Sequence, residues 1–233
     1  MLFYDTRYLM FMLPGIVIMM LVQWYVKSAY NRWSQVPARS RMTGADAAQR
    51  LIQAGGLSGV QIEGIAGNLT DNYDPRDKVL RLSRGVYASS SVAALAIAAH
   101  ELGHAMQDKE EYFPLRLRSA IVPAVSIGSY LGWILIIIGM LLQITQLAWL
   151  GVLVFSGGAL FALATLPVEL NASARARQLL AQTGIIQGDD EMRGVSNVLN
   201  AAALTYVAAL ITAVLQLLYW ATVVLGMGGR RRS

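Results

Sequence analysis

Four apolar stretches dominate this sequence and limit what it can fold into. They run from about Tyr8 to Val26, Ile121 to Ile144, Leu147 to Val168, and Ala201 to Leu225. Each is close to the roughly 20 residues that cross a bilayer as a helix. Only 14% of the residues are charged, against about 25% in an average soluble domain, and the mean hydropathy is +0.47. The sequence therefore predicts an integral membrane protein with about four transmembrane helices.

The order of these stretches predicts which polar segments share a side of the membrane. The first stretch ends with Trp24 and Tyr25 instead of a small-residue cleavage site, so we interpret it as a retained anchor. A short uncharged turn at Gln143–Gln146 separates the second and third stretches, which predicts a hairpin. Segments 27–118 and 169–200 then lie on the same face of the bilayer.

The basic residues indicate on which side of the membrane that face lies. Every Lys and Arg except Arg7 and the Arg230–Arg232 tail lies in segments 27–118 and 169–200. The positive-inside rule therefore predicts that these segments are cytoplasmic, although four full spans would leave the tail outside. The formal charge of +5 is attributed to these flanking residues and not to nucleic-acid binding, because no basic stripe with interleaved aromatics is present.

Segment 27–118 is long enough for a small folded unit. It contains a capping box at Thr43–Asp46, with Asp where Glu or Gln is usual. The predicted elements are a helix to about Ala54, a strand at 60–63, a turn at 71–77, a strand at 78–82 and a helix from Val92 to about Gln107.

The last of these helices carries the motif His100-Glu101-Leu-Gly-His104, which holds both histidines of the chain. Positions i and i+4 share one helix face, so both imidazoles can reach one zinc ion. This is the HExxH arrangement of zinc peptidases, in which zinc lowers the pKa of bound water and the carboxylate of Glu101 takes the proton. The alternative is a helix that merely contains these three residues, although unpaired polar groups would be costly on its apolar surface.

A third zinc ligand must be a carboxylate or something weaker, because no further His and no Cys exists. The candidate is Glu169, an ionisable residue at the end of the third apolar stretch and on the same side as the HExxH helix. The alternative is an interfacial Glu paired with Arg175 or Arg177.

Other polar residues have two interpretations each. The strand at 78–83 can align an extended peptide along an open sheet edge, or it is an ordinary sheet strand. Asp74 and Asp77 can orient a ligand histidine, or they shape a turn. The remaining candidates are basic residues that either stabilise an oxyanion or flank the spans: Arg81, Arg84, Arg116 and Arg118.

Seven blocks of the sequence carry a family resemblance: 69–75, 82–83, 91–94, 98–107, 114–116, 166–173 and 201–208. With them the chain resembles the YugP-like neutral zinc metallopeptidases of bacterial membranes over nearly its whole length. The resemblance implies a plasma-membrane zinc peptidase with His100 and His104 as ligands and Glu101 as catalytic base. The 166–173 block is also similar to that of HtpX-type membrane proteases, which implies Glu169 as third ligand. Those proteases have Asp where Ser173 stands, so a role for Ser173 is open.

From all this we predict a mainly α membrane protein with a small α/β zincin-like domain that carries the HExxH helix. The predicted parts are an anchor (1–26), a catalytic segment (27–118), a hairpin (119–168), a third-ligand segment (169–200), and a last span with its basic tail (201–233). The predicted function is a Zn²⁺-dependent endopeptidase, with its active site on the cytoplasmic side, that acts on membrane or membrane-adjacent polypeptides. It would contact lipid, and membrane-protein partners or a homo-oligomer are possible. The alternatives are an inactive scaffold with a structural zinc and, less favoured, a metal transporter.

Overall fold

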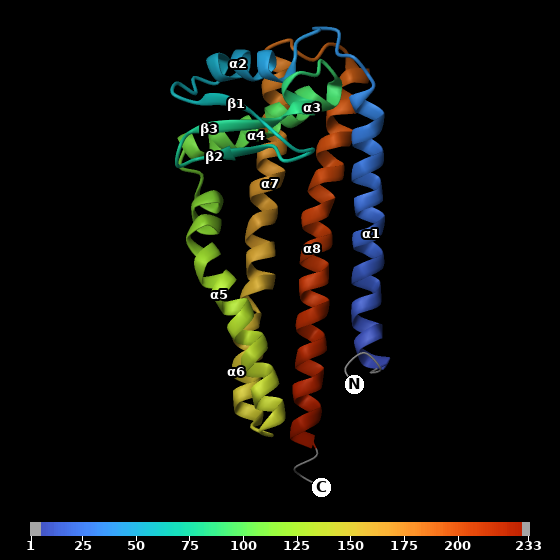
Figure 1. Ribbon diagram of the computed structural model, residues 1–233, viewed down its shortest axis with the longest axis vertical. Coiled ribbons are helices and arrows are strands. Elements are labelled where there is room, and N and C mark those ends of the chain that lie inside the picture. The colour runs from blue at the N-terminus through green and yellow to red at the C-terminus, as the bar shows by residue number, and fades with distance from the viewer. Residues whose placement is uncertain (1–5, 230–233) are drawn as a thin grey trace. The chain divides into compact units, whose positions relative to one another are not determined.

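The computed structural model describes residues 6–229, which are mainly helical with one small sheet (Figure 1). The elements are α1 (Thr6–Ser34), α2 (Gly44–Ala54), β1 (Gln61–Ile65), β2 (Asn72–Asp74), β3 (Val79–Ser83), α3 (Arg84–Tyr87), α4 (Val92–Lys109), α5 (Phe113–Leu141), α6 (Thr145–Phe155), α7 (Gly157–Gln182) and α8 (Asp189–Gly229).

Within residues 6–229, four helical stretches are long and apolar enough to cross a membrane, which confirms the predicted number. They are α1, α5, the consecutive α6 and α7, and α8 as far as Met227. Several helices continue well beyond the predicted apolar stretches, because helix formation does not stop where polar residues begin. The Arg230–Arg232 tail is an exception to the predicted cytoplasmic side of the basic residues. It lies outside the described residues.

The described chain divides into two compact units. The first, called the helical unit, contains residues 6–22, 116–166 and 205–229. The second, called the mixed unit, contains residues 23–115 and 167–204, and therefore the sheet with α2, α3 and α4. Helices α1, α5, α7 and α8 each contribute to both units.

In the helical unit, α5 and α6 form the predicted hairpin. The turn contains Gln143 in a left-handed conformation, with φ of 57°. The two helices approach so closely that a Cβ on Gly139 would lie 2.5 Å from the backbone nitrogen of Ala148. Ala148 belongs to a separate cluster of buried side chains in this unit: Ile136, Ala148, Val152, Tyr219, Trp220 and Val224.

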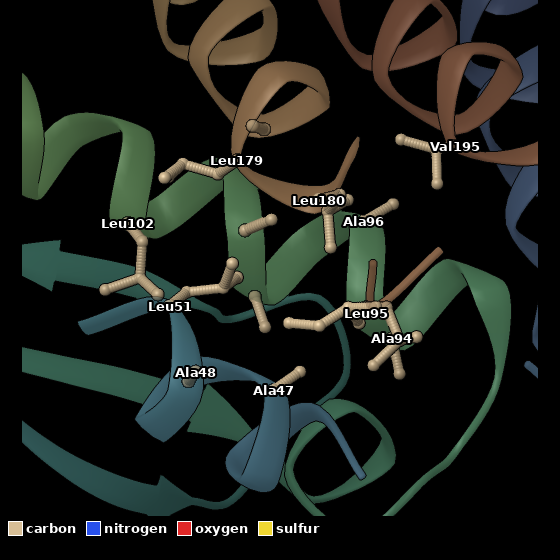
Figure 2. Packing of buried hydrophobic residues seen from close by; sticks show 14 of the residues in the cluster. Ala47, Ala48, Leu51, Ala94, Leu95, Ala96, Leu102, Leu179, Leu180 and Val195 are labelled. Carbon is tan, nitrogen blue, oxygen red and sulfur yellow. The ribbon is translucent and has the colours of Figure 1, made fainter. Parts of the chain in front are cut away.

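In the mixed unit, the predicted capping box begins α2. The Thr43 hydroxyl accepts from the backbone N–H of Asp46 at 3.1 Å, and the Asp46 carboxylate accepts from the backbone N–H of Thr43 at 3.0 Å. The helix ends at Ala54, before Gly55 and Gly56, as predicted. Its apolar face packs on α4, and Figure 2 shows Ala47, Ala48 and Leu51 directed at that helix.

The sheet differs from the prediction in one strand. Its order is β1-β3-β2, with β1 parallel and β2 antiparallel to β3. The segment predicted as a turn at 71–77 contains β2, which is only three residues long and therefore leaves no alternation to detect. Because β3 is paired on both sides, the strand at 78–83 is a central strand, and its interpretation as an open edge for a peptide is wrong.

Helix α4 is the centre of the mixed unit. The Ser91 hydroxyl caps it by accepting from the backbone N–H of Ala94 at 3.2 Å, and most of its alanines are buried. Its neighbours include α2 and the sheet, and Leu179 and Leu180 of α7 belong to the same core (Figure 2). Burial on many sides makes α4 a rigid platform for the polar residues it carries.

Candidate metal centre

The candidate site lies between α4 and α7, within the mixed unit. The two helices touch at Gly103, where a Cβ would lie 2.5 Å from the carbonyl oxygen of Ala172. A residue with a side chain at this position would hold the helices apart. The glycine inside the HExxH motif therefore allows the histidines of α4 to reach Glu169 of α7.

His100, His104 and Glu169 converge on one point. Their ligand atoms all lie within 4.8 Å of one another. The Nε2 atoms of His100 and His104 lie 3.3 and 3.6 Å from Oε2 of Glu169. Tetrahedral ligands at zinc-like bond lengths of about 2.0–2.2 Å are separated by about 3.3–3.6 Å. The two distances from Glu169 to the histidines therefore match those between ligands of one tetrahedral zinc ion.

The burial of these groups favours a cation between them. Glu169 is almost fully buried, with a side chain 3% exposed, and each imidazole is 14% exposed. Burial lowers the pKa of His104, but its hydrogen bond to Glu169 and the charge of Glu101 outweigh this, so that the pKa is raised. Two carboxylates thus create a negative environment that a bound divalent cation would neutralise.

Glu101 lies beside this cluster, and a hydrogen bond from the sheet holds its carboxylate in place. Its Oε2 accepts from the backbone N–H of Tyr73 on β2 at 3.1 Å. Burial raises the pKa of Glu101, while the neighbouring histidines lower it, and the net direction is upward. Such a shift is typical of a carboxylate that exchanges protons near neutral pH. The Tyr73 hydroxyl donates to Asp108 at 2.9 Å, which fixes β2 against α4.

Both imidazoles are also held on the side away from Glu169. Nδ1 of His104 lies 3.0 Å from Oε1 of Gln107, and Nδ1 of His100 lies 3.2 Å from the hydroxyl of Ser173. Ser173 therefore contacts a candidate ligand although it carries no charge. Metal-binding histidines usually have such a partner on their second nitrogen.

The alternative interpretation of Glu169 as the partner of an arginine does not match the structure. Arg175 forms a two-pronged ion pair with Glu110, at 2.7 and 2.8 Å. Arg177 donates to Asn200. Glu169 instead points at the two histidines.

The remaining sequence candidates lie elsewhere in the mixed unit or beyond it. Asp74 accepts from the backbone N–H of Arg76 and, with Asp77 and Glu63, pairs with Arg81. These residues shape the turn after β2 and do not orient a histidine. Arg84 begins α3, whereas Arg116 and Arg118 lie near the start of α5 in the helical unit.

Sequence reasoning missed two contributors to the site. The Tyr73 contact uses a backbone N–H, which any residue can supply, so no sequence signal marks it. Gln107 ends the motif block 98–107 and is a fully buried amide. Its three-residue spacing from His104 places it on a neighbouring position of the same helix, and this signal was available in the sequence.

Two imidazoles and one carboxylate around one point could hold a metal ion, and they are the ligand types of zinc hydrolases that use a His₂Glu set. The comparisons agree with this class. The chain belongs to the family described as "Putative neutral zinc metallopeptidase", whose model matches residues 8–225. It is 45% identical over 196 residues to the "Putative membrane protease YugP" of Bacillus subtilis (strain 168), covering 84% of this chain and 87% of that protein. No solved structure matches the chain. The family resemblance seen in the sequence is thus confirmed.

Proposed function

We propose that this protein is a zinc-dependent endopeptidase of the membrane that cleaves membrane or membrane-adjacent polypeptides. The observation that carries the proposal is the convergence of His100, His104 and Glu169 beside Glu101. The family supports a peptidase, and the four apolar helices with the similar membrane protease support an integral membrane protein.

The residues fit the roles that peptide hydrolysis requires. His100, His104 and Glu169 would hold Zn²⁺, which when bound polarises the scissile carbonyl and makes water more acidic. Glu101 would take a proton from the attacking water and pass it to the nitrogen of the leaving amine. The Tyr73 N–H holds one oxygen of this carboxylate. The second oxygen can then act as the proton acceptor without the side chain rotating.

Several features support placing this chemistry at the cytoplasmic surface of the membrane. All four residues belong to segments 27–118 and 169–200, which carry nearly all the basic residues. Glu169 directly follows the apolar part of α7. We therefore assign catalysis to these two segments and membrane insertion to the apolar helices.

The competing function is an inactive scaffold with a structural zinc. Structural zinc sites usually have four protein ligands. Among residues 6–229, the cluster of His and acidic side chains contributes three. A set of three protein ligands is typical of catalytic zinc sites, which favours catalysis over a purely structural role.

Replacement of the proposed base tests the proposal. The Glu101→Gln variant should keep its zinc, measured by elemental analysis, because Glu101 is not among the three ligands. It should lose cleavage of an unfolded polypeptide by at least about 100-fold, the lower range for general-base catalysis. Wild-type cleavage rates in a zinc-loaded Glu101→Gln variant would refute the mechanism.

A further inference from the structure

Gln107 is a polar side chain with no exposed surface in the core of the mixed unit. Glutamine is rarely buried completely, and a buried amide is costly unless its donors and its acceptor all have partners. Gln107 lies on α4, three residues after His104. Its contacts therefore bear directly on one of the candidate zinc ligands.

The partners of Gln107 fix which way its amide points. Nε2 lies 2.8 Å from the backbone carbonyl oxygen of Val168 and 2.9 Å from Oδ1 of Asn171. A carbonyl oxygen can only accept, so the amide nitrogen must face Val168. Oε1 must then face Nδ1 of His104, at 3.0 Å.

The orientation of Asn171 is fixed in the same way. Its Oδ1 also accepts from Nε of Arg175 at 2.7 Å. A guanidinium group can only donate, so the atom between Arg175 and Gln107 must be the oxygen of Asn171. Arg175 is itself held by both carboxylate oxygens of Glu110. Each group between Glu110 and Gln107 thus has a defined role as donor or acceptor: Arg175 donates to Glu110 and Asn171, and Asn171 accepts from Arg175 and Gln107.

The orientation of the Gln107 amide determines the tautomer of His104. An amide oxygen can only accept, so Nδ1 of His104 must carry the hydrogen. In the neutral ring the lone pair then lies on Nε2, the atom that points at Glu169. His100 differs, because its Nδ1 contacts the hydroxyl of Ser173, which can donate or accept.

We propose that Gln107 is a positioning residue that fixes the Nδ1–H tautomer and the ring direction of His104, so that its Nε2 is ready to bind zinc. The inference rests on the metal site of the proposed function, but not on peptide cleavage. Loss of such a partner typically lowers metal affinity by 10–100-fold. His104 is thus prepared for the metal by α4 and α7 together, whereas Ser173 leaves His100 free to adopt either neutral tautomer.

Two substitutions in the full-length protein test the role. Gln107→Met keeps the length of the side chain but removes the acceptor, and we expect zinc affinity, measured by competition with a chelator, to fall by about 10–100-fold. Gln107→Glu retains an acceptor for Nδ1–H but loses the donor to Val168 and Asn171, and we expect its zinc affinity to fall clearly less than that of Gln107→Met. Leu95→Ala, in the same helix and the same core, is the control that lowers stability without changing zinc affinity.

The tautomeric state of the two histidines can be measured by NMR without bound zinc and without an activity assay. The chain has only two, so the ring nitrogens of labelled histidine can be assigned by NMR with His100→Asn. In metal-free wild type at alkaline pH we expect the Nδ1–H tautomer for His104, and a mixture with Nε2–H in Gln107→Met. An Nε2–H tautomer in wild type, or unchanged zinc affinity in Gln107→Met, would overturn the proposal. Equal losses of affinity in Gln107→Met and Gln107→Glu would also overturn it. Because none of these measurements involves cleavage, they are distinct from the test of Glu101.

Discussion

Two helix pairs in this molecule approach closely at a glycine, but the two contacts serve different purposes. In the α5–α6 hairpin, a Cβ on Gly139 would lie 2.5 Å from the backbone of Ala148, and between α4 and α7 a Cβ on Gly103 would lie 2.5 Å from that of Ala172. In the hairpin contact, Ala148 belongs to a cluster of buried apolar side chains. The α4–α7 contact brings two imidazoles and a carboxylate together. Close helix approach is thus a general means of packing, and the neighbouring side chains determine whether it also forms a site.

The largest effect should follow when the contact between α4 and α7 is opened. The Gly103→Ala substitution places a methyl group against the Ala172 carbonyl, so one helix must shift. Overpacking of this kind costs about 1–3 kcal/mol of stability. Zinc affinity should fall at least about tenfold, because ligands from both helices must stay in register. Chelator competition on the purified variant measures this, and wild-type affinity would show that the close approach is not needed for the site.

The matched change in the hairpin should separate stability from metal binding. Gly139→Ala adds the same methyl group against Ala148, with a similar expected cost of about 1–3 kcal/mol. Its folded fraction should bind zinc as wild type does, since none of the proposed ligands lies in the helical unit. Thermal unfolding and zinc titration on the same sample provide the two values. A loss of affinity as large as that of Gly103→Ala would remove the distinction between the two contacts.

The smallest effect is expected at the start of α2, which contacts no ligand. Thr43→Ala removes half of the capping box and should cost about 1 kcal/mol of stability with no change in zinc affinity. The hydrogen bond from the Thr43 hydroxyl lowers the pKa of Asp46. A carboxylate with a lowered folded pKa stabilises the fold above its unfolded pKa, and this contribution is lost as pH falls through the folded pKa. The stability difference between Thr43→Ala and wild type should therefore narrow at acid pH; a constant difference would argue against the box.

Local signals in the sequence predict much of this fold. The ends of α2 follow from Thr43 and Gly55, the start of α4 follows from Ser91, and the membrane helices follow from apolar length. By contrast, β2 has three residues between turn formers, and its place beside α4 depends on the Tyr73 contacts to Glu101 and Asp108. Such tertiary contacts leave no periodic pattern to detect.

The candidate site shows the same division between local and tertiary information. His100 and His104 are paired by helix geometry alone. Glu169 could be suggested only indirectly, from the absence of other ligand types, its position at the end of an apolar stretch and the family resemblance. The direction of the Gln107 amide depends on Val168 and Asn171, about sixty residues further along the chain. Sequence patterns suggest the three candidate ligands, and tertiary packing explains how their side chains are oriented.

The zinc content of the Glu169→Ala variant tests the central claim most directly. Purified wild type should contain stoichiometric zinc, and Glu63→Ala, which removes an exposed carboxylate that pairs with Arg81, should match it. Glu169→Ala should lose most of its zinc while remaining folded, because two imidazoles alone hold zinc weakly. Undiminished zinc in folded Glu169→Ala would contradict the account, since the metal would then not lie between α4 and α7.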